Sequence, residues 1–259
     1  MRSHIRFGEY YHWAPHILSH IDRARFRHEF GPPDASRLAG IDAFVPLCLE
    51  DIRAMLQVRG PLSAKALVPT RAALELANNK IDFYDFLVAH GFESNVPRVI
   101  DSPTQFPVVA KLAYGSNGAG VWIVNDGAQL EALRRQHPGE DLFLTEYIDG
   151  TREYAFHLLA KHGKILWSGL VEHDHSVMGD KPFIRGRDGA TGSSRACDDF
   201  PELGVLHSIV GRLAFSGTAC FDFKVVEQTP KIFEINPRPG YSLALLINEY
   251  LDALIEQLA

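Results

Sequence analysis

The sequence has few cysteines, no long apolar run and no excess of positive charge. Its three cysteines are far apart among 259 residues, which argues against a disulfide framework and against Cys-x-x-Cys metal spacing. No segment reaches the roughly 20 apolar residues of a membrane span, and the N-terminus lacks the apolar core of a signal peptide. The formal net charge of -6 argues against broad nucleic-acid binding. We therefore expect a reduced, cytoplasmic protein with neither a membrane nor a nucleic-acid partner.

The composition is that of a folded globular protein. The hydrophobic fraction of 46% is ordinary for such proteins and too high for a disordered chain. A chain of 259 residues is long enough for one to three domains with a sizeable core.

Strand signals in the sequence come in pairs. Residues 106–114 and 121–125 are rich in β-branched side chains and flank a glycine-rich turn, which predicts a hairpin. Residues 151–173 predict two further strands around a turn at Gly163. Residues 218–236 predict a last hairpin with Thr229–Pro230 in its turn.

Helical spacing lies between these strand pairs. Residues 173–200 carry no periodic signal, as is typical of a functional or disordered loop. Alternation of antiparallel strand pairs with helices predicts an α+β fold, or α/β with mixed sheets, and we place a domain boundary near residue 79. Helices are expected at 49–60, 70–79, 80–91, 126–137, 201–215 and 243–259.

Two acids lie on the apolar strands of the last predicted hairpin. Asp222 and Glu234 each stand between apolar residues, so both belong to the polar face of their strand. A register that places them opposite one another brings like charges together, which is unfavourable unless a cation binds between them. Mg²⁺ prefers oxygen ligands and takes one or two carboxylates. Asp222, Glu234 and Asn236 therefore form a candidate metal set, and the alternative is a solvated strand face with unrelated charges.

The residues around this acid pair complete the pattern. Phe233 and Ile235 alternate with the polar positions, so we expect them to face a core. Arg238 lies one step beyond Asn236, where a guanidinium can meet a phosphate that the metal holds.

A glycine-rich loop follows the first strand of the first hairpin. Lys111 ends that strand, and Ser116, Asn117 and Gly118 lie in the loop. Glycines let backbone N–H groups approach anionic oxygens, and the two polar side chains add donors. The pattern is neither a P-loop nor a dinucleotide fingerprint. The loop either covers phosphates or is a plain hairpin tip.

Lys80 begins a predicted helix, where the helix dipole disfavours a cation. This misfit indicates another task for the side chain, and the alternative is an ordinary surface lysine.

The stretch "LTEYIDGTREY" ends a strand and enters a turn. At Glu146, Tyr147 and Ile148 an exposed strand end offers backbone groups that can read an adenine edge. Glu153, seven residues after Glu146, can accept hydrogen bonds from ribose hydroxyls. The alternative is a strand that leads into a charged turn.

Two further groups of side chains are candidates. The segment 173–200 holds several cations, of which Arg185 lies in its most structured part; they either bind carboxylate and phosphate or are solvated. His12, His16 and His20 have helical spacing, which favours a surface or interface stripe over a metal-binding face.

Taken in order, these motifs resemble those of the ATP-grasp superfamily, as in D-alanine–D-alanine ligase, biotin carboxylase and L-amino acid ligases. The resemblance runs from about Lys80 to Gly240. It implies two α+β subdomains, 80–149 and 150–259, that grip ATP and follow a short α/β unit, 1–79.

The resemblance also implies roles for individual residues. The usual arginine shortly before the metal aspartate is absent from "TACFD", so that task falls to Arg238 or Arg185. The implied roles are phosphate binding by Lys80, Lys111 and the loop with Ser116, Asn117 and Gly118; adenine contact at Glu146, Tyr147 and Ile148; ribose contact at Glu153; metal binding by Asp222, Glu234 and Asn236; and phosphate or acyl-phosphate contact at Arg238.

The implied activity is ATP-dependent amide-bond formation. An ADP-forming ligase would use Mg²⁺, or Mn²⁺ as a substitute, to join a carboxylate (amino acid, peptide or small acid) to an amine through an acyl-phosphate. Phosphoryl transfer of this kind depends on positioning and cationic stabilisation. The alternatives are a kinase for a small-molecule hydroxyl and a non-catalytic nucleotide-binding protein. A homodimer is the default expectation for a soluble enzyme.

Overall fold

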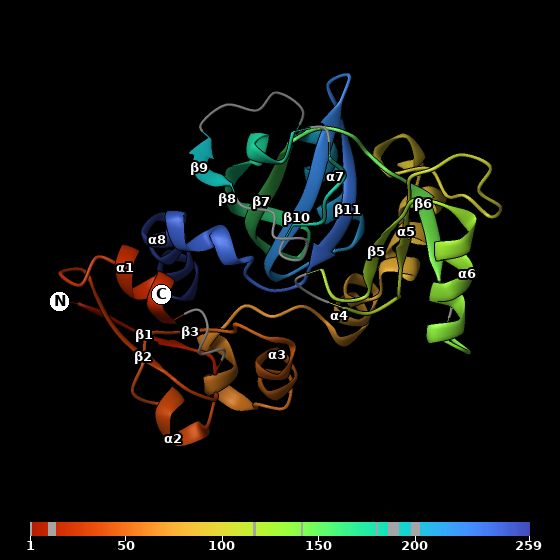
Figure 1. Ribbon diagram of the computed structural model, residues 1–259. Coiled ribbons are helices and arrows are strands. Elements are labelled where there is room, and N and C mark those ends of the chain that lie inside the picture. The colour runs from red at the N-terminus through yellow and green to blue at the C-terminus, as the bar shows by residue number, and fades with distance from the viewer. Residues whose placement is uncertain are drawn as a thin grey trace.

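The structure, a computed structural model, describes residues 2–9, 14–115, 118–140, 142–179, 181–185, 192–197 and 203–259. Its strands form three sheets (Figure 1). Within the described residues, no helix is long and apolar enough to cross a membrane.

The N-terminal sheet is parallel and has the order β2-β1-β3. Its hydrophobic core also includes the last helix of the chain, so the two ends of the sequence pack together (Figure 1). The bounds are β1 (Ser3–Phe7), α1 (Ala14–His20), β2 (Phe26–Phe30), α2 (Ala35–Leu38), β3 (Ala43–Val45), α3 (Leu49–Met55) and α8 (Ile247–Leu258).

A second, antiparallel sheet has the order β5-β4-β6. Apolar side chains of α6, Leu130 and Leu133, pack against its strands. The predicted hairpin at 106–125 is confirmed by the pairing of β4 with β5. The bounds are β4 (Val108–Lys111), β5 (Val121–Val124), α6 (Gly127–Gln136) and β6 (Phe143–Glu146).

The largest sheet is antiparallel and has the order β11-β10-β7-β8-β9. One face packs on α4, α5 and α7 around the main hydrophobic core. The opposite face lines a cavity. The bounds are α4 (Arg71–Asn78), α5 (Lys80–Ala89), β7 (Arg152–Lys161), β8 (Lys164–Asp174), β9 (Ser193–Cys197), α7 (Gly204–Arg212), β10 (Gly217–Val226) and β11 (Thr229–Asn236).

The turn of the last hairpin differs from the prediction. Thr229–Pro230 was expected in the turn, but these residues open β11, and Glu227 and Gln228 make the turn with positive φ of 47° and 65°. Two central residues with positive φ match the twist of the flanking strands. Pro230 is tolerated because β11 is an edge strand, where a missing N–H need not break the ladder.

A β-bulge sets the register of this hairpin. Phe223 pairs with Ile232, but Asp222 pairs with Glu234, so Phe233 is the extra residue. The predicted pairing of Asp222 with Glu234 is confirmed. The expectation that Phe233 faces a core is wrong: the bulge leaves it half-buried, lining the cavity.

Three other segments differ from the sequence-based expectation. The segment 173–200 contains a short 3-10 turn, Ser176–Met178, and the strand β9, which pairs with β8. The last helix is divided into a 3-10 turn, Tyr241–Leu246, and α8. The helix expected at 49–60 already ends at Met55.

Candidate active site

One cavity of about 740 Å³ contains nearly all the residues predicted from the sequence. It lies over the open face of the five-stranded sheet and reaches to β4, β6 and the start of α5. Ser116 and Asn117 lie outside the described residues. The predicted residues that line it are Lys80, Lys111, Gly118, Glu146, Tyr147, Ile148, Glu153, Arg185, Asp222, Glu234, Asn236 and Arg238.

Strand alternation explains why these side chains share one face. On β10, Asp222 and Lys224 line the cavity, whereas Phe221 and Phe223 are fully buried in the main core. On β7, Glu153 lines the cavity as well. Successive side chains of a strand point to opposite faces, so each strand sends polar groups to one side and apolar groups to the other.

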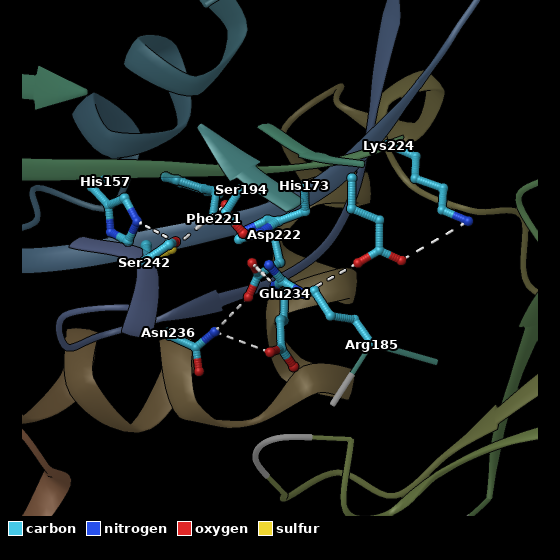
Figure 2. A network of polar contacts seen from close by, with 12 residues as sticks. His157, His173, Arg185, Ser194, Phe221, Asp222, Lys224, Glu234, Asn236 and Ser242 are labelled. Atoms are coloured by element: carbon cyan, nitrogen blue, oxygen red, sulfur yellow. Dashed lines mark hydrogen bonds and ion pairs between the residues drawn. The ribbon is translucent and has the colours of Figure 1, made fainter. Parts of the chain in front are cut away.

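The acid pair is bridged by an amide. Nδ2 of Asn236 donates hydrogen bonds of 3.0 Å to Oδ2 of Asp222 and of 3.0 Å to Oε1 of Glu234 (Figure 2). Burial raises the pKa of Asp222, and the Arg185 guanidinium only partly opposes this. For Glu234, burial also acts to raise the pKa, but the Lys80 ammonium and the hydrogen bond from Asn236 outweigh it, so the pKa is lowered.

Both predicted lysines lie beside Glu234. Lys80 Nζ is 3.2 Å from Oε2 of Glu234 and 2.8 Å from the carbonyl oxygen of Gly115. Lys111 is buried, and its Nζ lies 5.4 Å from the centroid of the Phe233 ring. Burial lowers the pKa of Lys111 to about 8, with Glu234 opposing and Lys80 assisting that shift.

Arg185 joins the acid pair to Glu153. Its Nε lies 3.3 Å from Oε2 of Glu153, and its terminal NH2 nitrogen contacts the carboxylate of Asp222 (Figure 2). Burial alone would lower the pKa of Arg185, but the carboxylates of Asp222 and Glu153 raise it. The guanidinium therefore stays charged and neutralises a buried acid, Glu153, and a half-buried one, Asp222.

The strand end at Glu146 to Ile148 is held by specific contacts. Oε1 of Glu146 accepts a 2.9 Å hydrogen bond from the backbone N–H of Arg98, so this carboxylate is already engaged. The Tyr147 hydroxyl accepts a 3.4 Å hydrogen bond from the backbone N–H of Phe183. The carbonyl oxygen of Ile148 accepts a 3.0 Å hydrogen bond from Lys224.

These geometric relationships can be compared with known proteins. No family model matches the sequence, and no curated protein matches it. The structure is similar to D-alanine–D-alanine ligase from Bacillus anthracis complexed with ATP, with a TM-score of 0.61 and 16% identity, over 100% of this chain and 97% of that one. It is also similar to phosphoribosylamine–glycine ligase from Thermotoga maritima, with a TM-score of 0.67 and 15% identity, over 98% and 75%. A third similar structure is the VanG D-Ala:D-Ser ligase from Enterococcus faecalis, with a TM-score of 0.65 and 14% identity, over 100% of both chains.

The chain has the ATP-grasp fold. These structural neighbours are ATP-grasp carboxylate–amine ligases. The predicted α+β class and the predicted ATP-grasp fold are both confirmed.

The acid pair is the candidate metal position of this cavity. Among the described residues, no group of three or more His, Cys, Asp or Glu side chains could hold a metal ion. The predicted set instead combines the two carboxylates of Asp222 and Glu234 with the amide of Asn236. Two facing, half-buried carboxylates suit a hard cation. To bind one, Asn236 would have to turn its carbonyl oxygen toward the pair in place of its amide nitrogen.

Several residues of the candidate active site were not predicted from the sequence. Lys224 is 2% exposed, lies 3.9 Å from Oε1 of Glu153 and stacks over the rings of Tyr147 and Phe183 at 5.3 and 4.8 Å. Its position two residues after Asp222 placed it on the same strand face, which was an available signal.

His157, a buried histidine of the candidate active site, was also missed. His157 and His173 have hydrogen-bonding serines, Ser242 at 2.9 Å and Ser194 at 2.7 Å (Figure 2). Burial, followed by the Arg185 charge, lowers the pKa of each histidine to about 3. A single ionisable residue inside the apolar run "YAFHLLA" was the available signal for His157.

Two of the N-terminal histidines lie nearer the candidate active site than expected. His16 and His20 line the cavity, and the His16 ring packs 4.2 Å from the ring of Tyr241. His12 lies outside the described residues. The N-terminal unit therefore contributes to the wall of the cavity.

Proposed function

We propose that this chain is an ADP-forming, ATP-dependent ligase that joins a carboxylate to an amine. The observation that carries the proposal is the convergence of two lysines, a bridged acid pair and two arginines in one cavity of about 740 Å³. Structural neighbours that are carboxylate–amine ligases support this reaction class, and one neighbour complexed with ATP supports the nucleotide. Because sequence identity to these neighbours is low, the substrate is inferred from the chemistry of the site.

The phosphates are assigned to the lysine end of the cavity. Lys80 and Lys111 lie beside Glu234, and Gly118 belongs to the loop that follows β4. Backbone N–H groups of a glycine-rich loop can approach phosphate oxygens closely. Ser116 and Asn117 of that loop are proposed as further donors.

The nucleoside is assigned to the other side of the same face. The backbone of Glu146, Tyr147 and Ile148 is proposed to read the adenine edge. Glu153 is proposed to accept hydrogen bonds from the ribose, which requires one of its present contacts, Arg185 or Lys224, to loosen.

Asp222, Glu234 and Asn236 are the proposed ligands of Mg²⁺, with Mn²⁺ as a substitute. The ion would neutralise charge on the phosphate oxygens during transfer. The chain's own part is to hold the two carboxylates opposite one another, which the bulge at Phe233 does.

The proposed reaction has two steps. A carboxylate oxygen of the acid substrate attacks the terminal phosphorus of ATP, the bond to the bridging oxygen breaks, and ADP leaves. The amine then attacks the acyl carbon, phosphate departs with the bonding electrons, and the amine loses a proton. Arg238 and Arg185 are proposed to stabilise negative charge on the transferred group.

Hydroxylamine trapping with an ADP-release assay tests this function. The protein is incubated with ATP, Mg²⁺, hydroxylamine and a panel of amino acids, peptides and small acids. A ligase forms a hydroxamate together with ADP, whereas a kinase for a hydroxyl releases ADP without hydroxamate. If Glu234→Gln left that turnover unchanged, the metal assignment would be wrong.

Four expectations from the sequence stay predictions beside this proposal. They are the unit boundaries 1–79, 80–149 and 150–259, a homodimer, a cytoplasmic location, and the amine as the second substrate.

A further inference from the structure

A buried imidazole and a serine form a pair that the proposed reaction does not use. His157 is fully buried on β7, and its Nε2 lies 2.9 Å from Oγ of Ser242 (Figure 2). Ser242 belongs to the 3-10 turn Tyr241–Leu246 and lines the cavity. The hydrogen bond therefore joins β7 of the five-stranded sheet to the turn that lines the cavity.

The surroundings of His157 decide which atom donates. Burial and the Arg185 charge lower the pKa of His157 to about 3, so the ring is neutral near pH 7. A neutral imidazole carries one N–H and one bare nitrogen. Its Nδ1 is buried and finds no hydrogen-bond partner among the described residues.

A proton on Nδ1 would therefore be a buried N–H without an acceptor. Among backbone groups, a buried N–H without a partner is rarer than a buried carbonyl oxygen without one. We expect the same preference for the two ring nitrogens. The proton then lies on Nε2, and His157 donates to Oγ of Ser242. The hydroxyl hydrogen of Ser242 is left free to donate to another group.

Arg238, four residues before Ser242 in the sequence, supplies a second donor to the same cavity. It lines the cavity, and its recorded bond is a 3.3 Å contact to the carbonyl oxygen of Pro239. Within the described part of the chain, no carboxylate lies at ion-pair distance from it, in contrast to Lys80 and Arg185. A charged guanidinium with a neutral hydroxyl donor suits a carboxylate.

We propose that Ser242, oriented by His157, donates a hydrogen bond to the carboxylate of the acid substrate in the cavity that Arg238 also lines. This assignment rests on the proposed ligase function for the identity of the carboxylate. Ser242 is a binding residue, and His157 is a positioning residue that acts through it.

The same geometry argues against Ser242 as a nucleophile. A serine nucleophile needs a base that accepts its proton. Here the imidazole is a donor to the hydroxyl, and a weakly basic ring is poorly matched to proton abstraction near neutral pH.

The tautomer is the first test, and it needs no substrate. Protein labelled with ¹⁵N-histidine is examined by two-bond ¹H–¹⁵N correlation, with His157→Gln used for assignment. The expected result is a neutral ring protonated on Nε2. A ring protonated on Nδ1, or an imidazolium at pH 7, would overturn the proposal.

Carboxylate binding is the second test, with acetate as the probe and acetamide as its uncharged control. We expect acetate, and not acetamide, to shift the His157 resonances. Ser242→Ala should weaken acetate binding roughly ten- to hundredfold, the loss typical of a hydrogen bond to a charged group. Ser208→Ala removes an exposed serine of α7 and should bind as the wild type does. Equal acetate affinity in Ser242→Ala and wild type would overturn the proposal, as would no acetate binding by the wild type.

His157 variants separate orientation from bulk. His157→Gln keeps an N–H donor and should retain most of the acetate affinity, whereas His157→Ala should lose about as much as Ser242→Ala. Loss of equal size in both His157 variants would contradict a donor role. Mass spectrometry after incubation with ATP should find Ser242 unmodified, and a phosphoryl or acyl adduct there would overturn the proposal.

These results stand apart from the ligase assignment. If acetate binding follows the expected pattern but no acid yields ADP or hydroxamate, the proposed reaction fails and the carboxylate site stands. If hydroxamate forms with the same KM for the acid in wild type and Ser242→Ala, the ligase stands and the carboxylate site fails.

Discussion

The guanidinium of Arg185 bonds directly to the carboxylate of Asp222, at the place where the sequence predicts a divalent cation. It also lies 3.3 Å from Oε2 of Glu153. A fixed cation of the protein therefore neutralises one of the two acids of the predicted metal pair, while Lys80 neutralises the other. Binding of a divalent ion requires these ion pairs to rearrange.

This competition predicts that Arg185→Ala binds divalent ions more tightly than the wild type. Mn²⁺ would no longer have to displace a guanidinium from Asp222, so we expect its dissociation constant in the absence of nucleotide to fall at least tenfold. Mn²⁺ titration followed by electron paramagnetic resonance measures this directly. The unliganded variant should unfold more easily, by about 1–3 kcal/mol, because a half-buried carboxylate loses its charged partner.

Arg134→Ala is the control for that variant. Arg134 pairs with Glu131 at 2.9 Å on α6, both side chains are exposed, and neither lines the cavity. It should leave Mn²⁺ affinity and stability nearly unchanged, since exposed ion pairs contribute little. Equal Mn²⁺ affinity in the wild type and Arg185→Ala would show that Arg185 does not compete for the metal position.

Burial of Lys111 should lower the stability of the fold, although its charge is proposed to bind phosphate. Burial lowers its pKa from 10.5 to about 8, so folding disfavours its charged form. The resulting destabilisation, about 3 kcal/mol, is fully present below pH 8 and disappears as the pH rises from 8 toward 10.5. Lys111→Met should therefore unfold at higher urea concentration than the wild type at pH 7, and the difference should shrink at pH 10.

The same variant should bind ATP poorly, because a phosphate-facing ammonium is lost. Lys161→Met, at the exposed end of β7, is the matched control and should change neither property. Lower stability of Lys111→Met at pH 7 would mean that the ammonium makes stabilising contacts that outweigh its burial.

Substitution of Lys224 should weaken binding of the nucleoside part of ATP and not of its phosphates. Its Nζ donates to the carbonyl oxygen of Ile148 at 3.0 Å and lies 3.9 Å from Glu153. In Lys224→Met the strand end proposed to read adenine loses this support, so adenosine and ATP should weaken by a similar factor in calorimetric titrations. The missing donor should also lower the free energy of unfolding by about 1–3 kcal/mol.

Lys231→Met is the control for Lys224. Lys231 also donates to a carbonyl oxygen, that of Ser94 at 2.7 Å, but it lies outside the cavity. Nucleotide affinity should be the same in Lys231→Met as in the wild type. A loss for ATP without a loss for adenosine would place Lys224 at the phosphate end instead.

The sequence predicted much of the site because its chemistry follows strand alternation. Asp222, Glu234 and Asn236 could be assigned to one face from their neighbours alone. The bulge at Phe233 could not, because it depends on where the turn closes, and Thr229–Pro230 suggested the wrong turn. The pairing of Asp222 with Glu234 was predicted from their shared strand face and not from the turn, so it was right although the turn was wrong and the bulge was not expected.

Long-range contacts account for what remained hidden. Nothing local in the sequence shows that Arg185 contacts Asp222, which lies later in the chain, or that His157 contacts Ser242, 85 positions away. The packing of α8 against the N-terminal strands likewise joins segments from opposite ends of the chain. Such contacts arise from the arrangement of sheets, which periodicity within a segment does not specify.

Gly240 provides a steric test of the cavity wall. Its φ of -79° is open to any residue, so only space requires glycine here. A Cβ at this position would lie 2.6 Å from Sγ of Cys220 and 2.8 Å from Cε1 of His157. Gly240→Ala should therefore push the His157 ring away from Ser242 and destabilise the protein by about 1–3 kcal/mol through overpacking. The His157 ring resonances should move even in the unliganded protein, and acetate affinity should fall with them.

Gly127→Ala, where a Cβ meets nothing within 4 Å, is the matched control and should match the wild type in both measurements. Unmoved His157 resonances in Gly240→Ala would show that the turn, rather than the ring, gives way.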